Sequence, residues 1–235
     1  MHRWRREPQE SSGARGMART RSENYEDIQL GILSKAAKLF ASKGYERSSI
    51  TDLSDACQLS RGALYHYFGS KEAILFAMLD SLVRALLKRL EQVAAPGGVP
   101  VETLARVVEA FIEYNARSPN EQIILLNDLG ALSEREQNEI TRIEQQIVDL
   151  VADVLIRVDT AGTITRSTKK VYTMMLVGMI NYTFTWYDPE GSVSPKQFAK
   201  MATELFLNGF LAPAANSVTE AKEPVRPLTR RTGKR

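Results

Sequence analysis

The chain has 235 residues, 43% of them hydrophobic, which is typical of a globular protein of one or two domains. Its single cysteine excludes an internal disulfide and a cysteine-rich zinc site. The formal net charge of +3 is uneven, because residues 1–24 carry +3 and residues 212–235 carry +4, which leaves −4 for the segment between them. The N-terminal residues are polar, and no run approaches about 18 apolar residues, so we expect neither a secretory signal nor a membrane span, and a cytoplasmic location.

The two ends of the chain are basic and lack apolar periodicity. We therefore expect disordered tails over residues 1–24 and 212–235. Basic tails can contact DNA phosphates, but a solvated tail without such a role accounts equally well for this composition.

From Tyr25 onward the apolar residues fall at helical spacing up to Gly44, which predicts a first helix ended by that glycine. Serines then open two short helices, the second capped by Ser60. These three helices form a predicted domain of residues 25–70. A long apolar stripe over residues 71–92 predicts a linking helix that stops before a Pro-Gly-Gly loop.

Residues 93–211 also show helical spacing. A long helix there opens with the capping-box pair Ser133 and Glu136. Because no segment shows the alternation of a strand, the predicted fold class is all-α.

Two short helices joined by a tight turn behind a supporting helix are typical of a helix-turn-helix, whose second helix enters the major groove. In that second helix, Leu64 and Phe68 lie four apart and are predicted to anchor it inward. The other faces, together with the helix starts that favour phosphate, are left for DNA. The predicted DNA-binding residues are Ser49, Thr51, Ser60, Arg61, Gly62, Ala63, Tyr65, His66 and Lys71.

The string Leu-Tyr-His-Tyr-Phe at residues 64–68, followed by Ser-Lys-Glu at 70–72, resembles the DNA-binding domain of the tetracycline-repressor (TetR) family, over residues 26–88. The resemblance implies about nine helices, with an N-terminal helix-turn-helix domain and a C-terminal ligand-binding and dimerisation domain over residues 93–211. It also implies a homodimer that binds palindromic operator DNA on the nucleoid. The dimer would be released by a small-molecule inducer, with no permanent cofactor.

By this likeness Tyr65, His66 and Lys71 contact phosphates, although the aromatic rings could instead serve core packing. One position departs from the family pattern, because Gln58 stands where the turn usually has glycine. A non-glycine residue in the left-handed conformation costs on the order of 1 kcal/mol.

Effector pockets between bundle helices are mostly apolar with a few orienting polar groups, and methionines suit adaptable pockets. The same residue types at helical spacing also form cores and dimer seams. The family likeness assigns the last two helices to the dimer interface, with an apolar face formed by Phe198, Met201, Leu205, Phe206 and Phe210. The candidate ligand-binding residues are Phe111, Tyr114, Asn127, Arg142, Met174, Met175, Gly178, Met179, Asn181, Tyr182 and Trp186.

Residues 181–195 resemble regulators of fatty, aromatic or steroid acid breakdown that respond to acyl-CoA thioesters. Residues 18–25 in turn resemble regulators of phenylacetate degradation. Together the two likenesses imply an effector such as phenylacetyl-CoA, with Arg106, Arg142 or Arg157 near the pocket mouth. The alternatives are a repressor of an efflux pump that responds to hydrophobic drugs, a ligand-independent helical adaptor, and an activator. An enzyme and a metal site are not expected, because the two histidines lack companions for a metal site or a catalytic triad.

Overall fold

The computed structural model describes the backbone of residues 13–211 and the side chains of residues 25–209. All regular structure in this range is helical, which confirms the predicted class. The elements, in chain order, are α1 (Gly13–Lys43), α2 (Ile50–Cys57), α3 (Arg61–Tyr67), α4 (Lys71–Val93), α5 (Pro100–Arg117), α6 (Pro119–Asp128), the 3₁₀ turn η1 (Leu129–Ala131), α7 (Glu134–Val158), α8 (Lys169–Asn181), the 3₁₀ turn η2 (Tyr182–Thr185) and α9 (Pro195–Leu211).

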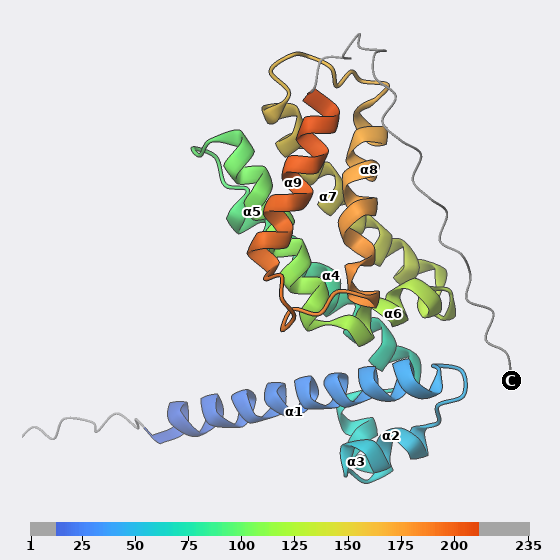
Figure 1. Ribbon diagram of the computed structural model, residues 1–235. Helices are drawn as coiled ribbons and strands as arrows, with labels where there is room; N and C mark the ends of the chain where they lie inside the picture. Colours follow the sequence, from blue (N-terminus) through green and yellow to red (C-terminus); the bar gives the residue numbers. More distant parts are fainter. Residues whose placement is uncertain (1–12, 212–235) are drawn as a thin grey trace, which may run out of the picture.

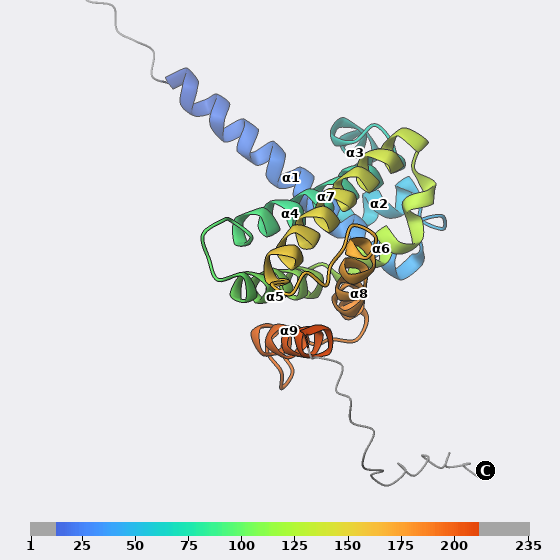
Figure 2. The same ribbon diagram turned by 90° about the horizontal axis from the view of Figure 1, so that it is seen from above.

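The first helix is longer than the sequence pattern predicts. It begins at Gly13 and not at Tyr25, so residues 13–24 are helical here, where the sequence pattern predicts a disordered tail. Good helix formers such as arginine, alanine and methionine dominate this stretch, and they favour a helix without any apolar stripe. Figures 1 and 2 show this part of α1 projecting beyond the rest of the molecule. The remaining tail predictions, for residues 1–12 and 212–235, lie outside the described residues.

Helices α1, α2 and α3 gather at one end of the molecule, with α5, α7, α8 and α9 at the other and α4 running between them (Figure 1). We call α1, α2 and α3 the head. Its core contains Phe40, Leu53 and Leu64, whose side chains are all at most 1% exposed. Cys57 is buried with them. Gly44 follows α1 with a φ of 89°, which explains why the helix ends there.

The helices from α5 to α9 form the body. In this bundle α4 packs on α5 and α7, α5 packs on α9, and α7 packs on α8. A buried amide holds it together: the Asn115 side chain donates to the carbonyl oxygens of Ile180 (3.1 Å) and Asn181 (3.2 Å). Its own oxygen accepts from the amide of Gln122 at 3.0 Å. One side chain thereby ties α5 to α6 and to the end of α8.

No helix among residues 13–211 is long and apolar enough to cross a bilayer.

The turn between α2 and α3 adopts the left-handed conformation at Gln58, with a φ of 57°. Gln58→Gly should stabilise the protein by up to about 1 kcal/mol, since glycine removes the steric cost of this conformation and loses part of that gain to its unfolded-state entropy. Thermal unfolding followed by circular dichroism should then show a rise in Tm of up to about 2–4 °C. Gln58→Ala keeps the steric cost and serves as the control, so an equal rise in both variants would contradict this account.

Candidate DNA interface and effector pocket

Helix α3 is buried on one face and open on the other. Leu64 is 0% exposed and Phe68 is 9% exposed, so both anchor the helix inward as predicted. Tyr65 is 50% exposed, and Arg61 and His66 are exposed with it. Figure 1 places α3 at the end of the molecule farthest from α8 and α9, where a duplex can approach it.

The starts of α2 and α3 are joined by a polar contact. The Arg61 guanidinium donates to the Thr51 hydroxyl at 2.6 Å, and both side chains are exposed. The Ser60 hydroxyl accepts from the Ala63 backbone N–H at 3.1 Å and caps α3. The two helix starts thus present a single surface, and helix starts are where backbone N–H groups favour phosphate.

Ser49 is engaged in capping α2. Its hydroxyl accepts from the Asp52 N–H and donates to the Asp52 carboxylate, which completes a capping box. Lys43 forms an ion pair with the same carboxylate at 2.6 Å, and this contact holds the pKa of Asp52 well below its usual range. The geometry therefore gives Ser49 a capping role, and its phosphate contact stays a prediction.

Lys71 points back into the head. Its ammonium donates to the carbonyl oxygens of Tyr45 (3.1 Å) and Ser48 (3.2 Å) and lies 4.0 Å from the centre of the Tyr45 ring. These contacts hold the loop between α1 and α2 against the start of α4. The predicted phosphate contact of this side chain is untested, and the geometry adds a structural role that the sequence pattern did not indicate.

His66 lies beside α1. Its ring meets the ring of Tyr25 edge to face, with centroids 6.0 Å apart. Tyr67 also packs against Tyr25, with centroids 4.7 Å apart. Helix α1 therefore supports the C-terminal end of α3 and positions its exposed face.

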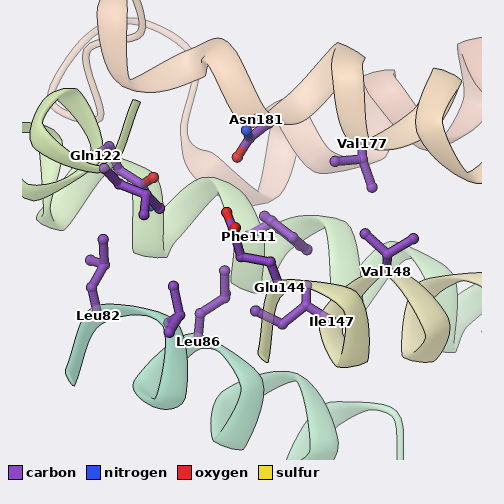
Figure 3. A pocket seen from close by; sticks show the side chains of 11 residues that line it. Leu82, Leu86, Phe111, Gln122, Glu144, Ile147, Val148, Val177 and Asn181 are labelled. Atoms are coloured by element: carbon purple, nitrogen blue, oxygen red, sulfur yellow. The ribbon is translucent and has the colours of Figure 1, made fainter. Parts of the chain in front are cut away.

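A cavity of about 90 Å³ lies between the helices of the body. Apolar side chains form most of its wall, with two amides and one carboxyl among them (Figure 3). The lining residues are Leu82, Val83, Leu86, Phe111, Gln122, Leu125, Glu144, Ile147, Val148, Val177 and Asn181. Of the predicted ligand-binding residues, only Phe111 and Asn181 line this cavity.

The other predicted ligand-binding residues lie elsewhere. Asn127 and Arg142 are exposed to solvent, and Tyr114 donates its hydroxyl to the Leu82 carbonyl at 2.6 Å, where burial raises its pKa to about 12. The rest lie on the outer face of α8, η2 and the residue after it. They are Met174, Met175, Gly178, Met179, Tyr182 and Trp186, all exposed. Met174 and Met175 line an open surface pocket on this face together with Val171, and the exposed apolar face also fits the alternative of a dimer seam.

Gln122 and Glu144 were missed by sequence reasoning. Glu144 follows Ile140 by four residues and precedes Ile147 by three, so it interrupts the apolar stripe of α7. An acidic residue at a core-facing helical position is a signal that could have identified it. Among the described residues, no group of three or more His, Cys, Asp or Glu side chains is placed to hold a metal ion.

Comparisons with known proteins identify a known family for both the N-terminal and the C-terminal part of the chain. The family model for bacterial regulatory proteins of the tetR family matches residues 32–78, and that for the tetracyclin repressor-like C-terminal domain matches residues 97–210. A TetR-family transcriptional regulator from Bordetella parapertussis 12822 superposes with a TM-score of 0.73 at 38% identity, over 79% of this chain and 97% of that one.

Curated relatives agree with these matches. The transcriptional repressor KstR2 of Rhodococcus jostii is 26% identical over 195 residues, which are 77% of this chain and 90% of that protein. YuxN, an HTH-type regulator of Bacillus subtilis, is 39% identical over 69 residues, but the match spans only 24% of its length. The chain therefore belongs to the TetR family of transcriptional regulators. Members of this family are DNA-binding transcription factors and not enzymes.

The inward contacts of Lys71 make a prediction. Lys71→Ala should lower the free energy of unfolding by about 1–3 kcal/mol, because it removes charged hydrogen bonds to two carbonyl oxygens. Chemical denaturation measures this loss, and Lys88→Ala, which removes an exposed lysine of α4, is the matched control. An unchanged stability combined with a shallower salt dependence of operator binding would show that Lys71 acts mainly on phosphate.

Proposed function

We propose that the protein is a homodimeric repressor that places two copies of α3 in successive major grooves of a palindromic operator. The observation that carries this proposal is the division of α3 between fully buried Leu64 and exposed Arg61, Tyr65 and His66. A recognition helix needs such apolar anchors behind an open polar face. KstR2, the relative with the longest alignment given above, is also a repressor. As a nucleoid-bound regulator, the protein would act in the cytoplasm.

The proposed contacts divide by position on this surface. Arg61 and Gly62, at the first turn of α3, are assigned to base edges, since an arginine can donate twice to guanine and a glycine lets the backbone approach. Tyr65 and His66 are assigned to phosphates. The starts of α2, α3 and α4 are also proposed to bind phosphates. The residues at or near these starts are Ser49, Thr51, Ser60, Ala63 and Lys71.

The dimer is proposed to form through α8 and α9, which contact each other. Their outer faces expose large apolar side chains, which in a soluble protein mark an interaction surface. A two-fold dimer buries the same patch from both copies. The exposed apolar residues are Val171, Met174, Met175 and Met179 on α8, and Met201 and Leu205 on α9. Phe198 and Phe206 are at least partly buried within the chain, and the side chain of Phe210 lies outside the described residues.

Helix α4 is the proposed route from effector to DNA. Its Leu82 and Leu86 side chains line the cavity, and its first residue, Lys71, holds the loop before α2. A ligand that favours a shifted α4 would change the spacing of the two α3 copies. Because half-sites lie about 34–36 Å apart, even a small change of spacing weakens binding to both at once.

The effector is proposed to be small and largely apolar. An acyl-CoA, the class implied by the resemblance of residues 181–195, could place only its acyl group in a cavity of about 90 Å³. A hydrophobic drug is the second candidate, and the carboxyl group of Glu144 in the cavity wall favours it when the drug is a cation.

Arg61→Ala should weaken binding to the DNA upstream of the protein's own gene by about tenfold or more, because each base-reading arginine contributes about 1–3 kcal/mol. Fluorescence anisotropy at fixed salt measures the change. Arg89→Ala removes an exposed arginine of α4 far from α3 and should leave the affinity unchanged. If Arg61→Ala and the unmodified protein bind with equal affinity, Arg61 is not part of the interface. If the unmodified protein binds no duplex at all, the proposed repressor function is refuted and the helical adaptor is favoured.

Leu205→Glu should convert the dimer to a monomer, because it places a charge on a side chain that is 69% exposed at the centre of the proposed seam. Sedimentation velocity should show half the mass, and operator affinity should fall with it. Leu126→Glu introduces the same charge at an apolar side chain of α6 that is 59% exposed, and it should stay dimeric. A dimeric Leu205→Glu protein would place the interface elsewhere.

A further inference from the structure

The cavity wall contains one carboxyl group, and the apolar side chains around it can form neither a hydrogen bond nor an ion pair with it. Figure 3 shows the Glu144 side chain reaching into the cavity from α7, with its carboxyl group pointing toward Asn181 and Gln122 to one side. Within the described part of the chain, this carboxyl group forms neither a hydrogen bond nor an ion pair. Burial among the apolar residues raises its pKa. Glu144 is partly buried. A carboxylate drawn partly out of water without a partner in the protein is unfavourable, so its position in the cavity wall points to a partner that comes from outside the protein.

The other polar groups of the wall also offer acceptors. The Gln122 amide donates one of its two N–H groups to Asn115 and keeps its side-chain oxygen as an acceptor. Asn181 reaches the cavity from the end of α8 and carries a second amide oxygen. A primary ammonium group has three N–H donors and no acceptor, and it matches a carboxylate flanked by two amide oxygens.

The same wall disfavours an anionic ligand. No arginine or lysine is among the described residues that line the cavity. Arg106 donates to Thr103 and Arg157 donates to the carbonyl oxygen of Ala94, so both are engaged elsewhere. A carboxylate or phosphate placed in the cavity would meet Glu144 without a compensating cation, which raises its free energy.

We infer that the effector is a compact hydrophobic amine whose ammonium group binds Glu144, flanked by Gln122 and Asn181. This inference rests on the proposed role of the cavity as the effector site. The apolar part of the amine contacts Phe111, Leu86 and the other aliphatic side chains of the wall. The volume of about 90 Å³ limits the enclosed part to an ammonium group and a few attached carbons, with a longer apolar substituent extending toward the opening.

The test compares matched pairs of opposite charge. Aryl-alkyl amines from benzylamine to 4-phenylbutylamine are paired with carboxylates of the same length, and phenylacetyl-CoA represents the rival class. Thermal shift and operator release are measured on the full chain at pH 7.5. The amines should raise Tm and release the operator, while the carboxylates and phenylacetyl-CoA should do neither. Stabilisation by the anions and not by the amines, or by no compound of either series, would overturn the inference.

Glu144→Gln supplies the decisive variant, because it keeps the shape and removes the charge. It should weaken amine binding by about tenfold or more, since charge-assisted hydrogen bonds to the ligand are lost. Glu134→Gln makes the same change at an exposed position of α7 and should bind amines as the unmodified protein does. Equal amine binding by Glu144→Gln would overturn the assignment of this carboxyl.

Stability and DNA binding separate the possible failures. The pKa of Glu144 is higher in the folded state than in the unfolded chain. The carboxyl group therefore lowers the free energy of unfolding progressively as the pH rises above the pKa that Glu144 has in the unfolded chain. No other ionisable side chain is among the described cavity-lining residues. Glu144→Gln should therefore raise Tm more at pH 7.5 than at pH 4, which shows that the variant folds. Operator affinity without ligand is measured in parallel, and Glu144→Gln should not change it. An unmodified protein that binds the operator but no amine would refute only the amine, and the proposed repressor would stand.

Discussion

Helix α4 is the element on which the rest of the structure depends, because it belongs to both the head and the body. Its 23 residues form one continuous helix, about 35 Å long at 1.5 Å per residue. At its start, Lys71 binds the carbonyl oxygens of Tyr45 and Ser48, and farther along Leu82 and Leu86 face the cavity. A rigid helix moves as a unit, so a change in packing at Leu82 alters the support of the head. The Tyr114 hydroxyl, which donates to the Leu82 carbonyl, couples α5 to the same point.

The cavity wall combines a rigid side with a responsive one. Asn115 is completely buried and binds the end of α8 and Gln122, so its contacts hold α5, α6 and α8 in a single arrangement. Glu144 belongs to α7 and has no comparable contact in the described part of the chain. Satisfied buried polar networks rigidify a core, whereas an unpaired carboxyl leaves a site whose energy changes strongly when a ligand arrives. In the proposed function, this difference would let one bundle be stable and still respond to a small molecule.

Two parts of the chain meet different physical demands. The head must fit a duplex of constant geometry, so its anchors, caps and exposed face have little freedom. In the proposed function the body has to support the head, form a dimer and enclose a ligand, and many side-chain combinations satisfy those needs.

The sequence by itself determined the all-helical class, the family and the two faces of α3, because caps, glycines and apolar spacing act within a few residues. Gly44, the Ser60 cap and the Leu64 and Phe68 anchors all lie where these local rules place them. Only the tertiary structure decided which apolar face meets a core, a cavity or solvent. Met175 and Phe111 look alike in a helical stripe, yet one is 56% exposed on α8 and the other lines the cavity. Helical periodicity shows that a face is apolar, but its partner depends on the packing of helices distant in sequence, and so does the surrounding of Glu144.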